Sequence, residues 1–284
     1  MITMMKMTYS EAYKWAVNIL EEARIVDAKI DARLLIEFIC EIDRHILIAY
    51  PDKDMGEDKW SLYREAVHRR CTHYPLQYIT GEQEFMGLRF KVNEDVLIPR
   101  QDSEFLVEEV LMKVHDGMKV LDVCTGSGCL IISVLKYKNN CSATAVDISE
   151  KALEVARENA RNNGVEINFV LGDLLENIDG KYDVIISNPP YIRSDVIPTL
   201  MDEVRFHEPM IALDGYEDGL YFYRKIIDEV WKHLNIGGYM LFEIGHDQGR
   251  AVSELMQAAG YKDIEVKKDY AGNDRVVMGY LASY

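Results

Sequence analysis

The chain has 284 residues, of which 48% are hydrophobic and 28% charged, a composition typical of a soluble protein with a sizeable core in one large or two modest domains. A formal net charge of −16 disfavours a protein that binds the phosphates of nucleic acid. No apolar stretch is long enough to span a bilayer. The first ten residues lack the apolar segment of a signal peptide, and the five cysteines show neither disulfide nor zinc spacing, so we expect a cytoplasmic protein with reduced thiols and no metal.

The N-terminal part of the chain is predicted to be helical. Thr8 and Glu11 fit a capping box, and the apolar residues that follow recur at helical spacing. Two further helices are expected at 31–40 and at about 57–72. Together they predict a small N-terminal helical domain over residues 1–74.

The pattern changes over residues 75–98. Short extended runs at 78–80 and across 84–92, punctuated by glycines, predict a hairpin connector. A helix at about 103–115 then opens the last segment, residues 99–284.

From residue 119 onward, strands and helices alternate regularly. The expected strands are 119–123, 143–147, 167–171, 182–187 and 239–244, and the expected helices are 128–137, 150–163, 219–234 and 248–259. This alternation predicts a parallel sheet wound right-handedly. Two last strands, 264–268 and 275–280, are joined by a short connection, so one of them should run antiparallel. The predicted fold class is α/β.

A glycine-bearing turn follows the first strand of this sheet. Its residues are candidates for cofactor binding because glycines let a ligand approach backbone N–H groups: Cys124, Thr125, Gly126, Ser127 and Gly128. The turn lacks the third glycine of a dinucleotide fingerprint. An acidic residue ahead of the turn, Asp122, suits the ammonium group of S-adenosylmethionine better than a pyrophosphate.

Acidic residues also stand at the ends of the next two strands. Asp147 ends the second strand, where a carboxylate hydrogen-bonds ribose hydroxyls, and Asp173 follows the third, where a polar group meets an adenine. The pattern predicts a nucleoside-bearing cofactor lying across the sheet. The alternative is an ordinary Gly-rich turn between a strand and a helix.

The segment Asn188-Pro189-Pro190-Tyr191 follows the strand at 182–187. The prolines fix φ and remove two backbone donors, which leaves carbonyl oxygens and the Asn188 amide free to face a ligand at a strand end. Such a platform suits the capture of a planar –NH2 group through both hydrogens, with Tyr191 covering its face. The alternative is a Pro-rich turn that only stops the strand.

Taken together, these motifs resemble the PrmC/HemK family of class I methyltransferases. The similar segments span nearly the whole chain: 31–35, 75–85, 97–104, 188–191 and 269–276. One position departs from the family, which usually has glycine where this chain has Cys124, and a Cβ there would crowd the methionine part of the cofactor. The resemblance implies a Rossmann-like, seven-stranded, mostly parallel sheet with a small N-terminal domain for substrate recognition.

The resemblance also implies an activity. Members of the family transfer a methyl group from S-adenosyl-L-methionine to the glutamine N5 of the Gly-Gly-Gln motif in class I peptide chain release factors, with S-adenosyl-L-homocysteine as product. It implies that the Asn188 side-chain oxygen and the Pro189 carbonyl each accept one hydrogen of the substrate –NH2. Pro190 and Tyr191 complete the substrate site, where Tyr191 packs the substrate and counts with Asn188 and Pro189 as catalytic. Leu174 and Asn188 join the cofactor site, and the protein is expected to be a monomer.

Three weaker expectations concern single residues or short segments. Arg100 is expected to pair with a carboxylate across the domain junction, and Glu243 to orient a loop rather than touch the cofactor. The segment 203–209 resembles a family loop that shapes the substrate pocket, with a solvated loop as the alternative.

Other functions stay open on the sequence alone. An amino-methyltransferase acting on nucleic acid would share the Asn-Pro-Pro-Tyr motif, but it predicts a basic region that the acidic composition does not offer. A glutamine methyltransferase of a ribosomal protein would share the whole catalytic motif. A non-catalytic cofactor-binding protein finds its only support in Cys124.

Overall fold

The computed structural model describes residues 6–283, and the part of the signal-peptide expectation that concerns residues 1–5 lies outside them. The chain divides into two compact units. The first comprises Met1–Gly81 with Asp202–His207, and the second comprises Glu82–Met201 with Glu208–Tyr284. Among the described residues, no helix combines the length and the apolar character needed to cross a membrane.

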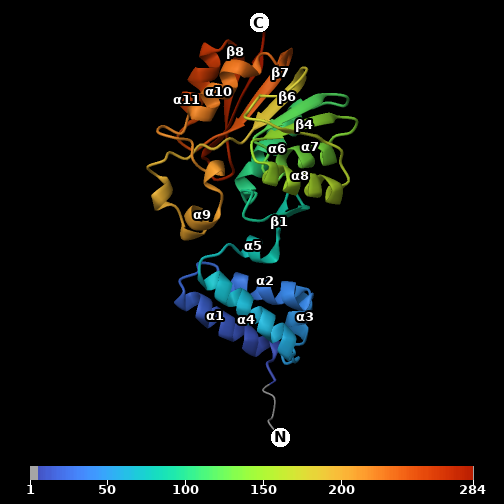
Figure 1. Ribbon diagram of the computed structural model, residues 1–284, viewed down its shortest axis with the longest axis vertical. Coiled ribbons are helices and arrows are strands. Elements are labelled where there is room, and N and C mark those ends of the chain that lie inside the picture. Colours follow the sequence, from blue (N-terminus) through green and yellow to red (C-terminus); the bar gives the residue numbers. More distant parts are fainter. Residues whose placement is uncertain (1–5, 284) are drawn as a thin grey trace. The chain divides into compact units, whose positions relative to one another are not determined.

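The first unit is a helical bundle. Its helices are α1 (Tyr9–Glu22), α2 (Ala28–Cys40), α3 (Arg44–Ala49), α4 (Glu57–Cys71), α5 (Leu76–Thr80) and α9 (Asp202–His207). Figure 1 shows α1, α2 and α4 packed against one another. The capping box at the start of α1 is confirmed: the Glu11 amide donates to Thr8 Oγ1 at 3.3 Å, and the Thr8 amide donates to the Glu11 carboxylate at 2.9 Å.

Residues 78–80, expected in the extended connector, belong to helix α5 instead. Pro75 precedes this helix with φ −55°, and Gly81 ends it in the left-handed conformation. Proline before and glycine after a short apolar run favour one helical turn. A run this short cannot be assigned from its periodicity alone, which explains the error.

A buried cluster of charges lies inside the first unit. Arg70 donates to Asp31 at 2.7 Å and to Glu203 of α9. Arg70 and Asp31 are only 4% and 5% exposed, so each charge depends on its partner. The segment around Glu203 is therefore not a solvated loop, because its helix is bonded to the bundle.

The second unit contains a hairpin, a seven-stranded sheet and helices. The strands are β1 (Glu82–Phe85) and β2 (Leu88–Lys91) of the hairpin, and β3 (Lys119–Val123), β4 (Ser142–Asp147), β5 (Asn168–Leu171), β6 (Tyr182–Ser187), β7 (Leu234–Glu243), β8 (Tyr261–Lys268) and β9 (Asp274–Leu281) of the sheet. The helices are α6 (Gln101–Lys113), α7 (Cys129–Tyr137), α8 (Glu150–Asn163), α10 (Tyr221–Val230) and α11 (Gly249–Ala258), with 3₁₀ turns at Ile197–Thr199 and Met210–Ala212.

Helices cover both faces of the sheet, because side chains alternate between the faces along each strand. Val120 and Val184 enter a core layer shared with α6, α7 and α8. Leu121 and Ile185, the next residues on the same strands, enter a layer shared with α10 and α11. Figure 1 shows α7 and α8 on one side of the sheet and α10 and α11 on the other.

The strand order is β5-β4-β3-β6-β7-β9-β8. Strands β3 to β7 run parallel, and β9 runs antiparallel to both of its neighbours. The expected seven-stranded, mostly parallel α/β sheet is confirmed, including the one reversed strand at the end of the chain. The direction of chain progression changes between β3 and β6, and ligands bind beyond the carboxyl ends of the strands at such a point.

The largest boundary difference concerns β7. The strand begins at Leu234, five residues before its expected start, while α10 ends at Val230. The pairing of β6 with β7 shifts register between Tyr182 and Val184, opposite the glycine pair at 237–238. A bulge of this kind hides the beginning of a strand, because it interrupts the apolar alternation.

Candidate active site

A cavity of about 350 Å³ lies where the central strands end. Val123, the last residue of β3, pairs with Val146 of β4 and Ser187 of β6, so the residues that follow these strands come together. The cavity is lined by nine of the residues predicted for the cofactor and substrate sites: Cys124, Thr125, Gly126, Ser127, Asp147, Asp173, Leu174, Asn188 and Pro190. They come from four strand ends, as the sheet topology requires.

Hydrogen bonds of Thr125 fix the turn after β3. The Thr125 amide donates to the Val146 carbonyl at 3.1 Å, and its hydroxyl donates to Asp122 Oδ2 at 2.6 Å. Cys124 has φ +65°, in the left-handed region that costs a residue with a Cβ about 1–2 kcal/mol. The turn thus keeps a glycine-like backbone at Cys124, which is one of the residues that line the cavity.

Gly128 is not among the residues that line the cavity. Its φ is +79°, and a Cβ at this position would lie 3.0 Å from Ile132 Cδ1 and 3.2 Å from Ala156 Cβ. Glycine is required there because α7 begins in a left-handed conformation and passes close to α8. In this structure Gly128 shapes the turn without facing the cavity.

Asp122 also lies beneath the turn and outside the cavity wall, in contrast to its expected place beside an ammonium group. Complete burial raises its pKa to about 7, although the Thr125 hydrogen bond opposes the rise. Asp122 therefore acts on the site through the turn that it supports.

The Asp147 carboxylate accepts hydrogen bonds from the turn after β3 and from the turn after β4. Its Oδ2 accepts from the Gly126 amide at 2.8 Å and its Oδ1 from the Ser149 amide at 2.9 Å. Burial raises the pKa of this carboxyl group, and backbone hydrogen bonds from Ser149, Gly126 and Ile148 oppose that rise. A carboxylate offers about four lone-pair sites, so at least one stays open to a further donor such as a ribose hydroxyl.

The Asn-Pro-Pro-Tyr turn separates this cavity from a second hollow. Asn188 and Pro190 line the first, Tyr191 lines the second, which measures about 1120 Å³, and Pro189 lies on the wall of neither. The Tyr191 carbonyl accepts from Gln248 Nε2 at 3.0 Å. The turn is thus fixed between the two spaces.

The comparisons with known proteins agree with this geometry. A family model described as the PrmC N-terminal domain matches residues 11–81, and one described as the methyltransferase small domain matches residues 100–204. A release factor glutamine methyltransferase from Clostridium acetobutylicum is 40% identical over 279 residues, which cover 96% of this chain and 98% of that relative. One from Moorella thermoacetica is 40% identical over 280 residues, covering 96% and 99%.

The chain belongs to the release factor glutamine methyltransferase family. Among solved structures, a methyltransferase from Pyrococcus furiosus matches with a TM-score of 0.53 at 21% identity, covering 70% of this chain and 90% of that one. That similarity supports the methyltransferase fold of the second unit.

Aromatic residues that the sequence did not mark surround the methyltransferase cavity. Tyr216 and Tyr221 line both hollows, with ring centroids 4.6 Å apart, and Phe222 lines the first. The two residues of α10 carry an apolar helical pattern that indicates core, and Tyr216 has a φ of +67° that no sequence pattern signals. The nearby Gly215 was a possible clue, since a Cβ there would lie 2.7 Å from Tyr191 Cα.

Arg100 pairs with Glu208 inside the second unit. The expectation that it reaches across the domain junction is therefore wrong. Glu208 is 6% exposed and also accepts from the Ile98 amide at 3.4 Å. The pair closes the wall of the cavity, because Arg100 is one of its lining residues.

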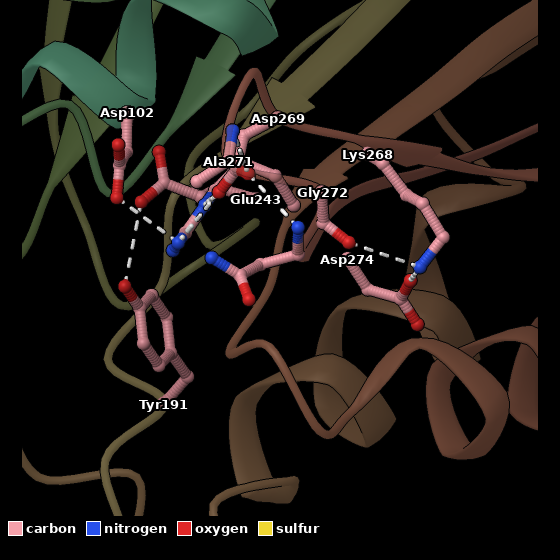
Figure 2. Close-up of polar contacts among 10 residues, drawn as sticks. Asp102, Tyr191, Glu243, Lys268, Asp269, Ala271, Gly272 and Asp274 are labelled. Carbon is pink, nitrogen blue, oxygen red and sulfur yellow. Dashed lines mark hydrogen bonds and ion pairs between the residues drawn. The ribbon is translucent and has the colours of Figure 1, made fainter.

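The closing turn between β8 and β9 is held by Asp269, as Figure 2 shows. This carboxylate accepts from the amides of Ala271 at 3.0 Å and Asn273 at 2.9 Å. It also binds Arg275 at 3.1 Å, and the same guanidinium reaches Asp102 at 3.0 Å. The segment that resembles the family's closing hairpin thus connects β9 to the start of α6.

Proposed function

We propose that this methyltransferase transfers a methyl group from S-adenosyl-L-methionine to the side-chain amide N5 of the glutamine in the Gly-Gly-Gln motif of class I release factors. The observation that carries the proposal is the position of the Asn-Pro-Pro-Tyr turn. Asn188 and Pro190 share a cavity wall with the expected cofactor residues, while Tyr191 lines the neighbouring hollow. The names of the full-length relatives support the choice of substrate.

The cavity suits the cofactor in size and in chemistry. Its volume of about 350 Å³ falls within the usual range for small-molecule sites. In the bound complex Asp147 would hold the ribose hydroxyls, Asp173 and Leu174 would contact the adenine, and the turn at 124–127 would accommodate the methionine part. When bound, S-adenosylmethionine supplies a methyl group on a positively charged sulfur and leaves as S-adenosylhomocysteine.

The turn compensates for the poor nucleophilicity of an amide. An amide nitrogen is a poor nucleophile because its lone pair is delocalised into the carbonyl. Asn188 Oδ1 and the Pro189 carbonyl accept its two hydrogens, which fixes the nitrogen and favours positive charge on it. Positioning of this kind contributes on the order of 7–11 kcal/mol at best. Immediately after the transfer the methylated nitrogen carries a positive charge and is strongly acidic, so it loses a proton to water and needs no His or Lys base. Tyr191 packs the substrate side chain.

The proposal also assigns a role to each part of the chain. Residues 1–74 recognise the release factor, residues 75–98 connect the two domains, and residues 99–284 catalyse the methyl transfer. The protein acts in the cytoplasm as a monomer without direct contact to nucleic acid, in keeping with its net charge of −16.

Incubation with S-adenosylmethionine and a purified release factor tests this function. Peptide mass analysis should find one added methyl on the Gly-Gly-Gln glutamine. Asn188→Ala should lower kcat on the order of 100-fold while the cofactor Kd changes little, because the variant loses one preorganised acceptor. Asn235→Ala is the control and should keep full activity, because it removes only the hydrogen bond that Asn235 Nδ2, near the start of β7, donates to Asp183 Oδ1.

Two results would contradict the proposal. One is an unmodified release factor together with methylated duplex DNA or ribosomal protein. The other is full activity of Asn188→Ala, which would remove the substrate-holding role from this residue.

A further inference from the structure

We propose that Ser103 and Glu243 are positioning residues that set the orientation of the Asn188 side-chain amide. The inference rests on the proposed function, in which Asn188 Oδ1 receives a hydrogen of the substrate. Neither Ser103, on α6, nor Glu243, at the end of β7, belongs to the turn that they would orient.

The contacts connect one carboxyl group to both ends of the turn. Asn188 Nδ2 donates to Ser103 Oγ at 3.4 Å, and the Ser103 side chain hydrogen-bonds to Glu243. At the other end, the Tyr191 hydroxyl donates to Glu243 Oε1 at 3.4 Å. Figure 2 shows the Tyr191 ring pointing its hydroxyl at this carboxyl group, beside Asp102.

These contacts are buried. Ser103 is 3% exposed and Glu243 is 2% exposed, so water cannot easily replace a lost partner. Glu243 Oε2 has no hydrogen-bond partner within the described part of the chain, and a buried acceptor without a partner loses the hydrogen bonds that water gives it in the unfolded chain. A buried acid retained at such a cost beside a catalytic turn points to a functional role.

The polarity of the contacts decides which way the Asn188 amide faces. A serine hydroxyl carries one proton, and an ionised carboxylate can only accept. Burial raises the pKa of Glu243 to about 7, so Glu243 is ionised and acts only as an acceptor where the pH exceeds that value. When Ser103 donates to Glu243, its oxygen is left as an acceptor, so Asn188 turns its NH2 group toward Ser103. Oδ1 then faces the opposite way, toward the substrate. If the Asn188 amide were flipped, its NH2 group would face the –NH2 group of the substrate. Both groups are donors, so no hydrogen bond could form between them.

The first test compares three serine variants in the full chain. Ser103→Ala should lower kcat on the release factor about tenfold, with KM and the cofactor Kd changed by less than about twofold. Ser103→Thr keeps a hydroxyl and should recover most of that loss. Ser133→Ala is the matched control, because Ser133 is equally buried but donates only to Cys129 of its own helix. Equal kcat for Ser103→Ala and Ser133→Ala would overturn the proposal.

The second test changes the carboxyl group and covers the case in which Ser103→Ala does not fold. Glu243→Gln introduces an amide donor that competes for Ser103 Oγ, so kcat should again fall about tenfold at unchanged cofactor affinity. Glu109→Gln is its control, since Glu109 is also a buried glutamate with an unpartnered oxygen, but its charged neighbours are Lys267, Glu265, Lys113 and Glu108 and it has no contact with Ser103 or Tyr191. Wild-type kcat in Glu243→Gln would contradict the role of Glu243.

A third measurement separates this inference from the proposed substrate. The side-chain NH2 protons of Asn188, assigned by their loss in Asn188→Ala, should exchange with solvent more slowly in the wild type than in Ser103→Ala. Equal exchange would overturn the orientation by Ser103 whatever the substrate is. A wild type that leaves the release factor unmodified, but protects these protons, would contradict only the proposed function.

Discussion

Cys124 stands where the methyltransferase turn has a glycine-like backbone. Its φ of +65° lies in the region that disfavours a Cβ, and its side chain lines the cavity. Burial raises the pKa of its thiol well above the usual value, so the group stays neutral. The sequence indicated that a Cβ there would crowd the cofactor, and the structure adds a backbone cost on the order of 1–2 kcal/mol.

Two substitutions at Cys124 separate the effect of the Cβ from that of the sulfur. Cys124→Gly should bind S-adenosylhomocysteine several-fold more tightly, because it removes both the strain and the crowding. Cys124→Ala keeps the Cβ and should stay within about twofold of the wild type. Isothermal titration measures both, and an equal gain in the two variants would assign the effect to the sulfur instead.

At the scale of elements, the position of α9 depends on one buried arginine in the helical unit. Arg70 contacts Asp31 of α2 and Glu203 of α9, and burial raises the pKa of Asp31 while Arg70 opposes that rise. These partners come from distant parts of the sequence, so no local pattern predicts them. Breaking a buried pair leaves the remaining charge without compensation.

Arg70→Ala should therefore lower the free energy of unfolding of the helical unit by about 3–5 kcal/mol. Trp15 and Trp60, whose rings are 4.9 Å apart in this unit, report the transition by fluorescence in urea. Arg33→Ala is the control: its Glu37 pair is more exposed and should be worth less than about 1 kcal/mol. Similar losses in both variants would show that the buried cluster is not special.

For the whole molecule, burial of Asp122 links stability to pH. Folding raises the pKa of Asp122 from an ordinary carboxyl value to about 7, so the folded chain keeps this proton to a higher pH than the unfolded chain. The resulting stabilisation is complete below about pH 4 and is lost as the pH rises through about 7. At one pKa unit per 1.36 kcal/mol, the difference is on the order of 4 kcal/mol.

Asp122→Asn should consequently gain stability relative to the wild type as the pH rises from about 4 to 8. Chemical denaturation at several pH values measures this difference. Asp116→Asn, at an exposed position, is the control and should follow the wild type throughout. A constant difference between Asp122→Asn and the wild type would contradict the raised pKa.

The composition and motifs of the sequence determined the class of this protein. Alternating strands and helices predicted the seven-stranded sheet, and strand-end residues such as Asp147 and Asn188 were found on one cavity wall. Such predictions succeed because parallel strands bring their carboxyl ends to one edge, whatever the details of packing. Periodicity was a weaker guide in short runs, as the helical residues 78–80 between Pro75 and Gly81 show.

Only the tertiary structure decided which residues face the cavity and which support it. Asp122 and Gly128 belong to the cofactor motif in sequence, yet neither is among the residues that line the cavity, while Tyr216 lines both hollows without any motif. Ser103 and Glu243 meet Asn188 and Tyr191 through contacts that span 85 and 52 residues. A sequence pattern records which residues are near along the chain, but the orientation of a side chain depends on packing and hydrogen bonds that form only when distant segments meet.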